Sequence, residues 1–96
     1  MPAYIILDIE VTDPVGFERY KQAAAPALAV YGGKYLARGG RTETLEGDWS
    51  PTRLVILEFP DVGHAKQWLE SPEYREARGL RRQSANTDIV AIEGVA

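Results

Sequence analysis

The sequence predicts one domain of the α+β class, in which two helices cover one face of a four-stranded antiparallel sheet. The first observation is length, because 96 residues leave room for a single domain, residues 1–96. The second is the presence of four short segments rich in β-branched and apolar residues. The third is that segments with helical periodicity alternate with them in the order βαββαβ. This order is that of the ferredoxin-like fold.

The first half of the chain contains a strand and a helix. Residues 3–11 are β-branched and apolar on one face and mixed on the other, which predicts a strand covered on both sides over its first half. Asp13 and Pro14 predict a helix start, because Asp caps helices and Pro suits the first helical position. Pro26 is expected to kink or split this helix, and Gly32 is expected to end it. The predicted buried stripe consists of Phe17, Tyr20, Ala24, Leu28 and Tyr31.

Residues 32–40 contain two glycine pairs that bracket a second predicted strand, residues 33–38. Strict alternation along this strand places Tyr35 and Ala37 on one face and Arg38 on the other. Arg38 then lies at the end of the strand, beside backbone that carries no side chains. A guanidinium in such a place can hold a carboxylate or a phosphate. Arg38 is therefore the first candidate for a ligand-binding residue.

A structural ion pair is the alternative role for Arg38. Glu58 and Asp8 are expected to share a sheet face with Arg38, and the pair can form within one chain or between two chains. Replacing Arg38 with Met, with dimer stability and ligand binding measured separately, distinguishes the two roles.

The second half of the chain repeats the pattern of strand and helix. Residues 39–52 are rich in Gly, Asp and Pro and predict a hairpin connection, which a short extended piece at Thr42–Leu45 lengthens. Residues 53–59 predict the third strand, which is the most apolar. Asp61 is the expected cap of the second helix, and residues 87–93 predict the fourth strand.

The pair Ser71-Pro72 predicts that a helix restarts there, by the same cap-and-proline pattern. One face of this continuation combines aromatic, small and basic side chains. Its members are Tyr74, Ala77, Arg78, Arg81 and Ala85. Arginines on a face that should be buried indicate either loose packing or a polar cavity beside the helix.

Composition excludes several functional classes. The net charge is −3, which argues against binding to nucleic acid or to anionic membranes. The chain has no cysteine, which excludes disulfides and thiolate catalysis, and its single histidine, His64, excludes a multi-histidine metal site within one chain. No metal or other cofactor is predicted. Because no signal-peptide pattern and no apolar run of about 20 residues occurs, the expected location is the cytoplasm.

The second face of the predicted sheet has no helices to cover it. Ile6 on the first strand, and Leu54 and Ile56 or their alternates on the third, leave neither face hydrophilic. An exposed apolar face of this size makes a monomer prone to aggregation. We therefore expect a homodimer in which two copies pack sheet against sheet.

Four segments of the chain are distinctive as a set, in their order and spacing. They are Gly-Gly-Lys-Tyr-Leu-Ala-Arg-Gly-Gly (32–40), Leu-Glu-Gly-Asp-Trp (45–49), Glu-Phe-Pro (58–60) and Trp-Leu-Glu-Ser-Pro-Glu-Tyr (68–74). Together they resemble the family known as domain of unknown function 1330, over essentially the whole chain. The resemblance implies the dimeric α/β-barrel superfamily, in which two ferredoxin-like subunits join their sheets into a barrel. It implies no established activity, because that superfamily includes cofactor-independent monooxygenases, muconolactone isomerases, haem enzymes and proteins of unknown role.

Five further residues are candidates for a site, and each has a structural alternative. Trp49 lies on the connecting loop, where it either stacks on a ligand or plugs the end of the barrel or packs on the partner. His64 can titrate near neutrality and act as an acid or base, or it is simply exposed at a helix start. Tyr20, Trp68 and Tyr74 lie on helical stripes, and they either line a cavity or belong to the core.

Three functions are open at this point. The first is a small homodimer that binds a small molecule between sheet and helices. Its expected ligand-binding residues are Arg38, Tyr20, Trp49, Trp68 and Tyr74. The second is an enzyme of the cofactor-independent monooxygenase or isomerase type, in which His64, Asp8 or Glu58 moves a proton. The third is a structural or interaction module without a ligand.

Overall fold

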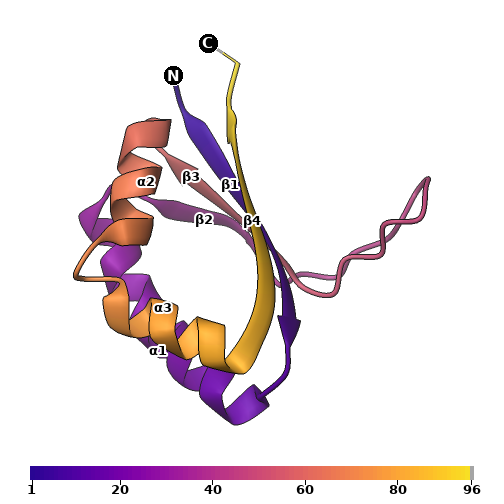
Figure 1. Cartoon of the computed structure of the whole chain (residues 1–96). Coiled ribbons are helices and arrows are strands. Elements are labelled where there is room, and N and C mark those ends of the chain that lie inside the picture. The colour runs from indigo at the N-terminus through magenta and orange to yellow at the C-terminus, as the bar shows by residue number, and fades with distance from the viewer. Residues whose placement is uncertain (96) are drawn as a thin grey trace.

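In the computed structural model, which describes residues 1–95, a four-stranded antiparallel sheet carries three helices on one face (Figure 1). The elements are β1 (Ala3–Val11), α1 (Pro14–Val30), β2 (Lys34–Arg38), β3 (Leu54–Phe59), α2 (Val62–Glu70), α3 (Arg75–Ser84) and β4 (Ala85–Glu93). The predicted βαββαβ order is confirmed, with the second helical segment divided into α2 and α3. Within residues 1–95, no helix is long and apolar enough to cross a membrane.

The strand order in the sheet is β2-β3-β1-β4, so β2 and β4 are the edge strands. Strand β1 pairs on one side with β3, where Leu7 lies opposite Val55, and on the other with β4, where Leu7 lies opposite Ile89. The residues of β1 and β3 that face the helices are buried, as period-two alternation requires. The core between sheet and helices includes Ile5, Leu7, Ile9, Phe17, Leu28, Leu57, Phe59 and Trp68.

The predicted helix starts are only partly confirmed. Asp61 caps α2, because its carboxylate accepts the backbone N–H of His64 at 2.8 Å. Pro14 is the first residue of α1, but the side chain of Asp13 makes no capping hydrogen bond. Pro26 lies inside α1 without splitting it. Because Pro26 is on the exposed side of the helix, the carbonyl group that loses its donor there faces water.

A turn separates α2 from α3, so the predicted restart of a helix is confirmed, but its predicted start at Pro72 is three residues too early. The hydroxyl of Ser71 donates to the carbonyl oxygen of Trp68 at 2.8 Å and accepts the N–H of Tyr74 at 3.1 Å. Helix α3 begins only at Arg75. Ser71 therefore closes the turn with its side chain, and this turn places Tyr74 in the core, where it is 0% exposed.

A β-bulge in β2 changes the direction of Arg38. Tyr35 pairs with Leu57 and Arg38 pairs with Val55, although three residues separate Tyr35 from Arg38 and only two separate their partners. Both partners are buried on the helix side, so Tyr35 and Arg38 share that face. The guanidinium carbon of Arg38 lies 4.4 Å from the centroid of the Tyr35 ring. The prediction of opposite faces is wrong, because one extra residue reverses the alternation beyond it.

The face of the sheet opposite the helices is uncovered and partly apolar, as expected from the sequence. On β4, Val90 and Ile92 are 59% and 56% exposed, and Ile6 beside them on β1 is half-buried. At the other end of this face, Lys34 forms an ion pair with Glu58 at 3.0 Å. The half-buried Leu54 and Ile56 of β3 are on this face as well, so its apolar part extends over β3, β1 and β4.

Residues 39–53 form an arm that projects away from the sheet between β2 and β3 (Figure 1). Most of the arm is exposed, and the predicted extended piece at Thr42–Leu45 is not a strand. The carboxylate of Asp8 holds the base of the arm, because it accepts the indole N–H of Trp49 at 3.0 Å and the backbone N–H of Thr52 at 3.2 Å.

Candidate functional site

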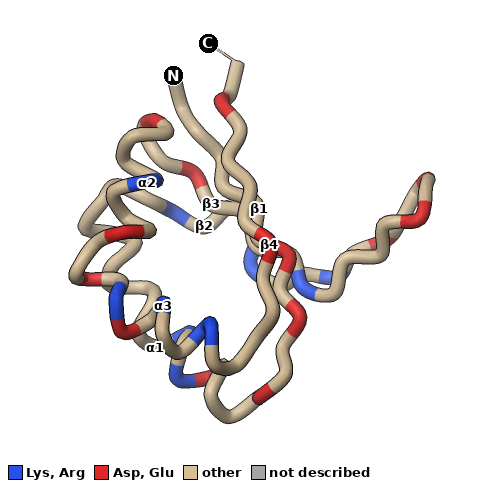
Figure 2. The backbone as a smooth tube through the Cα atoms, in the orientation of Figure 1, with Lys and Arg blue, Asp and Glu red and all other residues tan. Residues whose placement is uncertain are grey.

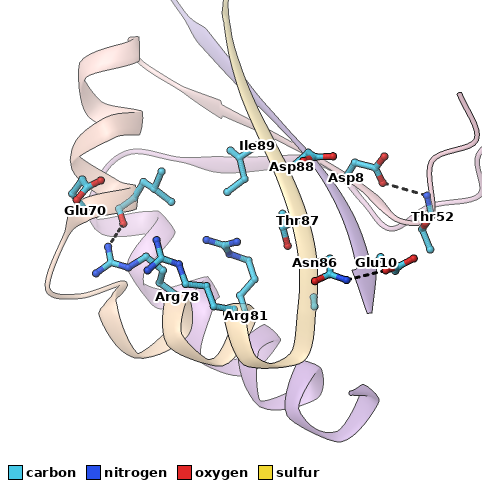
Figure 3. A pocket seen from close by; sticks show the side chains of 13 residues that line it. Asp8, Glu10, Thr52, Glu70, Arg78, Arg81, Asn86, Thr87, Asp88 and Ile89 are labelled. Carbon is cyan, nitrogen blue, oxygen red and sulfur yellow. Dashed lines mark hydrogen bonds between the residues drawn. The ribbon is translucent and has the colours of Figure 1, made fainter. Parts of the chain in front are cut away.

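A cavity of about 720 Å³ lies along the edge strand β4 and extends between it and the helices α2 and α3 (Figure 3). The part on the helix side is called the arginine cavity below. Its lining includes Leu69, Arg78, Arg81, Arg82, Thr87 and Ile89. The cavity also reaches around β4, where Asp8 and Asp88 point away from the arginines (Figure 3).

The arginine cavity exists because the helices do not cover β4 as closely as they cover β1. Ile89 and Ala91 face the helices, since they pair with the buried residues Leu7 and Ile5 of β1. Nevertheless Ile89 is only half-buried and Ala91 is exposed. Helix α3 leads into β4 without a loop, so the last arginines of the helix lie beside the first residues of the strand.

Arg81 is a buried cation without an anionic partner. Its side chain is 6% exposed, its Nε atom has no hydrogen-bond partner, and no carboxylate of residues 1–95 forms an ion pair with it. The Oγ1 atom of Thr87, which lines the same cavity, is also buried without a partner. Such groups destabilise a folded chain unless something compensates them. Together they mark a place where a bound anion would be stabilised.

The charges around β4 are separated by the strand. Basic residues of α3 lie on the helix side, whereas Asp8 and Asp88 are direct cross-strand neighbours on β1 and β4 and point away from the arginines (Figures 2 and 3). Arg78 is held in place by a hydrogen bond of 2.6 Å from its Nη1 atom to the carbonyl oxygen of Leu69. Asp8 and Asp88 lie on the far side of β4, and Glu70 of α2 is the one carboxylate of this lining on the helix side (Figure 3). Three arginines line that side as well, namely Arg78, Arg81 and Arg82, so the arginine cavity keeps an excess of positive charge.

Two buried tyrosines lie between α1 and the turn before α3. The hydroxyl oxygens of Tyr20 and Tyr74 are 2.9 Å apart and form a hydrogen bond. Burial raises the pKa of Tyr20 well above its usual range, and Tyr74 raises it further, while Arg81 acts in the opposite direction. The phenol of Tyr20 therefore stays protonated near neutral pH and can share a proton in a hydrogen bond, but it cannot act as a base.

The raised pKa of Tyr20 predicts a loss of stability at alkaline pH. Tyrosines of the unfolded chain ionise at a pH of about 10. Below that pH the contribution of Tyr20 to the free energy of unfolding is fully present, and it is lost as the pH rises above it. The slope is about 1.4 kcal/mol per pH unit while only the unfolded state is ionised. Urea denaturation across this range measures this slope, and Tyr20→Phe is expected to reduce it. Part of the slope remains, because burial also raises the pKa of Tyr35. A folded protein in which Tyr20 ionises freely near pH 10 contradicts the prediction.

Three of the five predicted ligand-binding residues come together in the core. The ring centroids of Trp68 and Tyr74 are 4.4 Å apart, and those of Tyr20 and Tyr74 are 6.4 Å apart. These rings pack on one another, as the core alternative describes. Trp68 also lines a second, apolar cavity of about 150 Å³, and its Nε1 atom is buried without a partner.

Arg38 lies at β2, the edge of the sheet opposite the arginine cavity. There it lines a niche of about 20 Å³ together with Arg53. The expected ion pairs of Arg38 do not form within the chain. Glu58 pairs with Lys34, and Asp8 accepts hydrogen bonds from the arm. Both carboxylates are on the open face, whereas the bulge turns Arg38 to the helix face.

Trp49 and His64 lie outside the arginine cavity. Trp49 is 60% exposed on the arm. The Nδ1 atom of His64 lies 2.8 Å from a carboxylate oxygen of Asp61 at the exposed start of α2. Hydrogen bonds from the ring and from the backbone N–H of His64 lower the pKa of Asp61. Among the three residues predicted to move a proton, only Asp8 lines any part of the 720 Å³ cavity, and it does so beyond β4, outside the arginine cavity.

The sequence predicted either loose packing or a polar cavity beside Arg78 and Arg81, and the structure shows the cavity, although neither residue was among the expected ligand-binding residues. The sequence places Arg78 and Arg81 on a helix face expected to be buried, which is a usable signal, since arginines are rare at buried positions. Thr87 carries no such signal. Its importance depends on the space between β4 and the helices, which local sequence does not reveal.

Comparison with known proteins gives one family and a common fold. The family model "Domain of unknown function (DUF1330)" matches residues 2–95, which confirms the resemblance, and no curated protein matches the chain. A protein of unknown function from Rhodopseudomonas palustris has a similar structure, with a TM-score of 0.76 and 21% identity over 99% of this chain and 83% of that one.

Two more distant structures share the fold. A dimeric ferredoxin-like protein of unknown function from Jannaschia has a TM-score of 0.67 and 15% identity, over 98% of this chain and 100% of that one. SnoaB, a cofactor-independent oxygenase from Streptomyces nogalater, has a TM-score of 0.66 and 13% identity, over 99% of this chain and 94% of that one. At such identities the likeness establishes the ferredoxin-like fold alone.

Proposed function

The chain belongs to the DUF1330 family, whose function is unknown, and we propose that it binds a small anionic molecule in the arginine cavity. The observation that carries this proposal is Arg81, a cation that is 6% exposed and has no anionic partner within residues 1–95. Thr87 offers a second unpartnered group in the same lining. A carboxylate or phosphate would accept hydrogen bonds from both, and the planar fork of an arginine suits either anion.

The energetics of Arg81 support a binding role over a structural one. A buried ion pair contributes little to stability, and a buried charge without a partner costs more than a pair does. In the ligand-free protein, Arg81 therefore lowers the stability of the folded state. An anion that enters the cavity offsets this cost and stabilises the folded state in proportion to its concentration.

Replacing Arg81 with Met is expected to abolish anion binding and to stabilise the free protein by about 1–3 kcal/mol, because an apolar side chain replaces an unpaired buried charge. Calorimetric titration with acetate and inorganic phosphate measures the first effect, and urea denaturation measures the second. Arg75→Met is the matched control, because Arg75 lies exposed on the same helix. A variant that loses stability and still binds anions as the wild type does would assign Arg81 to structure.

The homodimer is a second part of the proposal, with the open face of the sheet as the interface. The exposed Val90 and Ile92 on that face support it, as does the dimeric state named for the ferredoxin-like neighbour from Jannaschia. Sedimentation equilibrium is expected to give a dimer for the wild type and a monomer for Val90→Lys. Val30→Lys, a change of an exposed valine on α1, is expected to leave the dimer intact. A monomeric wild type rules out this interface.

A reaction without a cofactor is the alternative function. It is supported by Asp8, a carboxylate that lines the part of the 720 Å³ cavity on the other side of β4 from the arginines. The fold that this chain shares with the oxygenase from Streptomyces nogalater is compatible with such a reaction, but a shared fold does not identify a substrate. Chemical change of a bound ligand that is lost in Asp8→Asn favours the enzyme. Recovery of the ligand unchanged favours the binding protein.

A further inference from the structure

We propose that the ligand is an amphipathic acid, whose anionic head contacts Arg81 and Thr87 and whose apolar body occupies the second cavity, beside Trp68. This inference rests on the proposed function and adds the chemical class of the ligand. The second cavity is called the apolar cavity below. It has a volume of about 150 Å³.

The apolar cavity adjoins the arginine cavity. Leu69 of α2 and Ile89 of β4 line both of them, so the two cavities meet between these side chains. The remaining lining of the apolar cavity consists of Ile5, Ala65, Lys66, Trp68 and Ala91. A molecule held at Arg81 therefore needs only to extend past Leu69 and Ile89 to reach it.

Strand β4 sets the direction and the length of such a molecule. Thr87, Ile89 and Ala91 are successive residues on the helix side of the strand. Alternate residues of a strand are about 6.6–6.8 Å apart. A head group at Thr87 and a body between Ile89 and Ala91 are then separated by roughly 7–10 Å between their centres. A ring joined to a carboxylate by a short chain has this length.

The size and chemistry of the apolar cavity define the body. A cavity of about 150 Å³ with apolar walls accepts a molecule the size of benzene. Its walls are aliphatic apart from the indole of Trp68 and the side chain of Lys66, which is exposed. A cationic body would lose its hydration there and meet Lys66, and an anionic body would find only that one exposed ammonium group as a partner. The body is therefore uncharged and apolar.

Trp68, which lines the apolar cavity, carries one unsatisfied polar group. The residue is 2% exposed, and its indole N–H is buried without a hydrogen-bond partner. Buried indole N–H groups normally find an acceptor. An oxygen substituent on the apolar body would supply one. We therefore expect a ring that carries a hydroxyl or carbonyl group to bind more tightly than the bare ring.

The test uses Trp68 itself as the sensor. The chain has two tryptophans, so Trp49→Phe leaves Trp68 as the only source of indole fluorescence. This protein is titrated with acetate, inorganic phosphate, phenylacetate, phenylpropionate, hydroxyphenylpropionate and benzyl alcohol, and calorimetry on the wild type gives the affinities. We expect the better aromatic acid to bind at least tenfold more tightly than acetate, which corresponds to about 1.4 kcal/mol. We also expect the aromatic acids to change Trp68 emission, whereas phosphate does not.

A variant that fills the apolar cavity tests the contribution of the apolar body to affinity separately from that of the anionic head. Ala91→Leu adds bulk at an exposed residue of the cavity wall. It is expected to lower the affinity for the aromatic acids to that for acetate, while acetate still binds. Ala25→Leu on the exposed side of α1 is the matched control, and it is expected to bind the aromatic acids more tightly than acetate, as the wild type does.

The outcomes distinguish this inference from the proposed function. If acetate or phosphate binds in an Arg81-dependent way and the aromatic acids gain nothing, the amphipathic ligand is ruled out and the anion site stands. If no anion binds, both proposals fail. If benzyl alcohol binds as tightly as the aromatic acids and Arg81→Met changes nothing, the anionic head is ruled out.

Discussion

Replacing Tyr74 with Ala is expected to cost about 3–5 kcal/mol of stability, which is the range for truncating a buried aromatic residue. Tyr74 is 0% exposed, its ring lies against Trp68, and its hydroxyl bonds to Tyr20. A domain of this kind has only about 5–15 kcal/mol of total stability, so the variant is expected to be largely unfolded or close to it. Urea denaturation followed by far-ultraviolet circular dichroism measures the loss.

Tyr74→Phe is the matched control, because it keeps the ring and removes only the hydroxyl. The hydroxyl of Tyr20 is then left without this partner, at a cost of about 1–3 kcal/mol. The difference between the two variants isolates the packing of the ring against Trp68. Equal losses in the two variants would mean that the hydrogen bond, and not the packing, holds this part of the core.

Replacing Gly39 with Ala is expected to cost about 1.5–3 kcal/mol, from two causes. Gly39 has φ = +68°, a left-handed conformation that a side chain disfavours by about 1–2 kcal/mol. In addition, a Cβ atom at Gly39 would overlap the guanidinium of Arg53. That group lies 5.3 Å from the ring centroid of Phe17, and moving it away would sacrifice a contact worth about 0.5–1 kcal/mol. Chemical denaturation measures the sum.

Two glycines of the arm separate these causes. Gly47 has φ = +90° and open space around a Cβ, so Gly47→Ala is expected to show the conformational cost alone. Gly40 has open space and no positive φ, so Gly40→Ala is expected to be neutral or slightly stabilising. The expected order of losses is Gly39, Gly47, Gly40. A Gly39 variant as stable as the Gly40 variant contradicts both causes.

Local signals predicted most of the fold. Alternation and β-branched composition located the strands, and the cap at Asp61 and the proline at Pro14 located two helix starts. The direction of Arg38 was not predictable in this way. It depends on the extra residue that β2 carries against β3, and that register is a property of the pairing of two strands.

The candidate site was predictable only in part. Helical periodicity placed Arg78 and Arg81 on a face that should be buried, and the structure shows both in the lining of a cavity. The periodicity did not show that a space remains between α3 and β4. The distance between two elements depends on all the side chains that pack between them. Tyr20, Trp68 and Tyr74 are the converse case, since aromatic residues on a helical stripe have the same pattern in a core as beside a ligand.

The position of β4 has a consequence for synthesis of the chain. Strand β1 is made first, but one of its two hydrogen-bonded neighbours is β4, which is made last. The two strands pair from Ala3 opposite Glu93 to Val11 opposite Ala85. Pairing across almost the whole chain is slow to form and leaves an unpaired strand exposed in the meantime. A nascent chain therefore cannot complete its sheet, or close the wall of its cavity, until its final strand has left the ribosome.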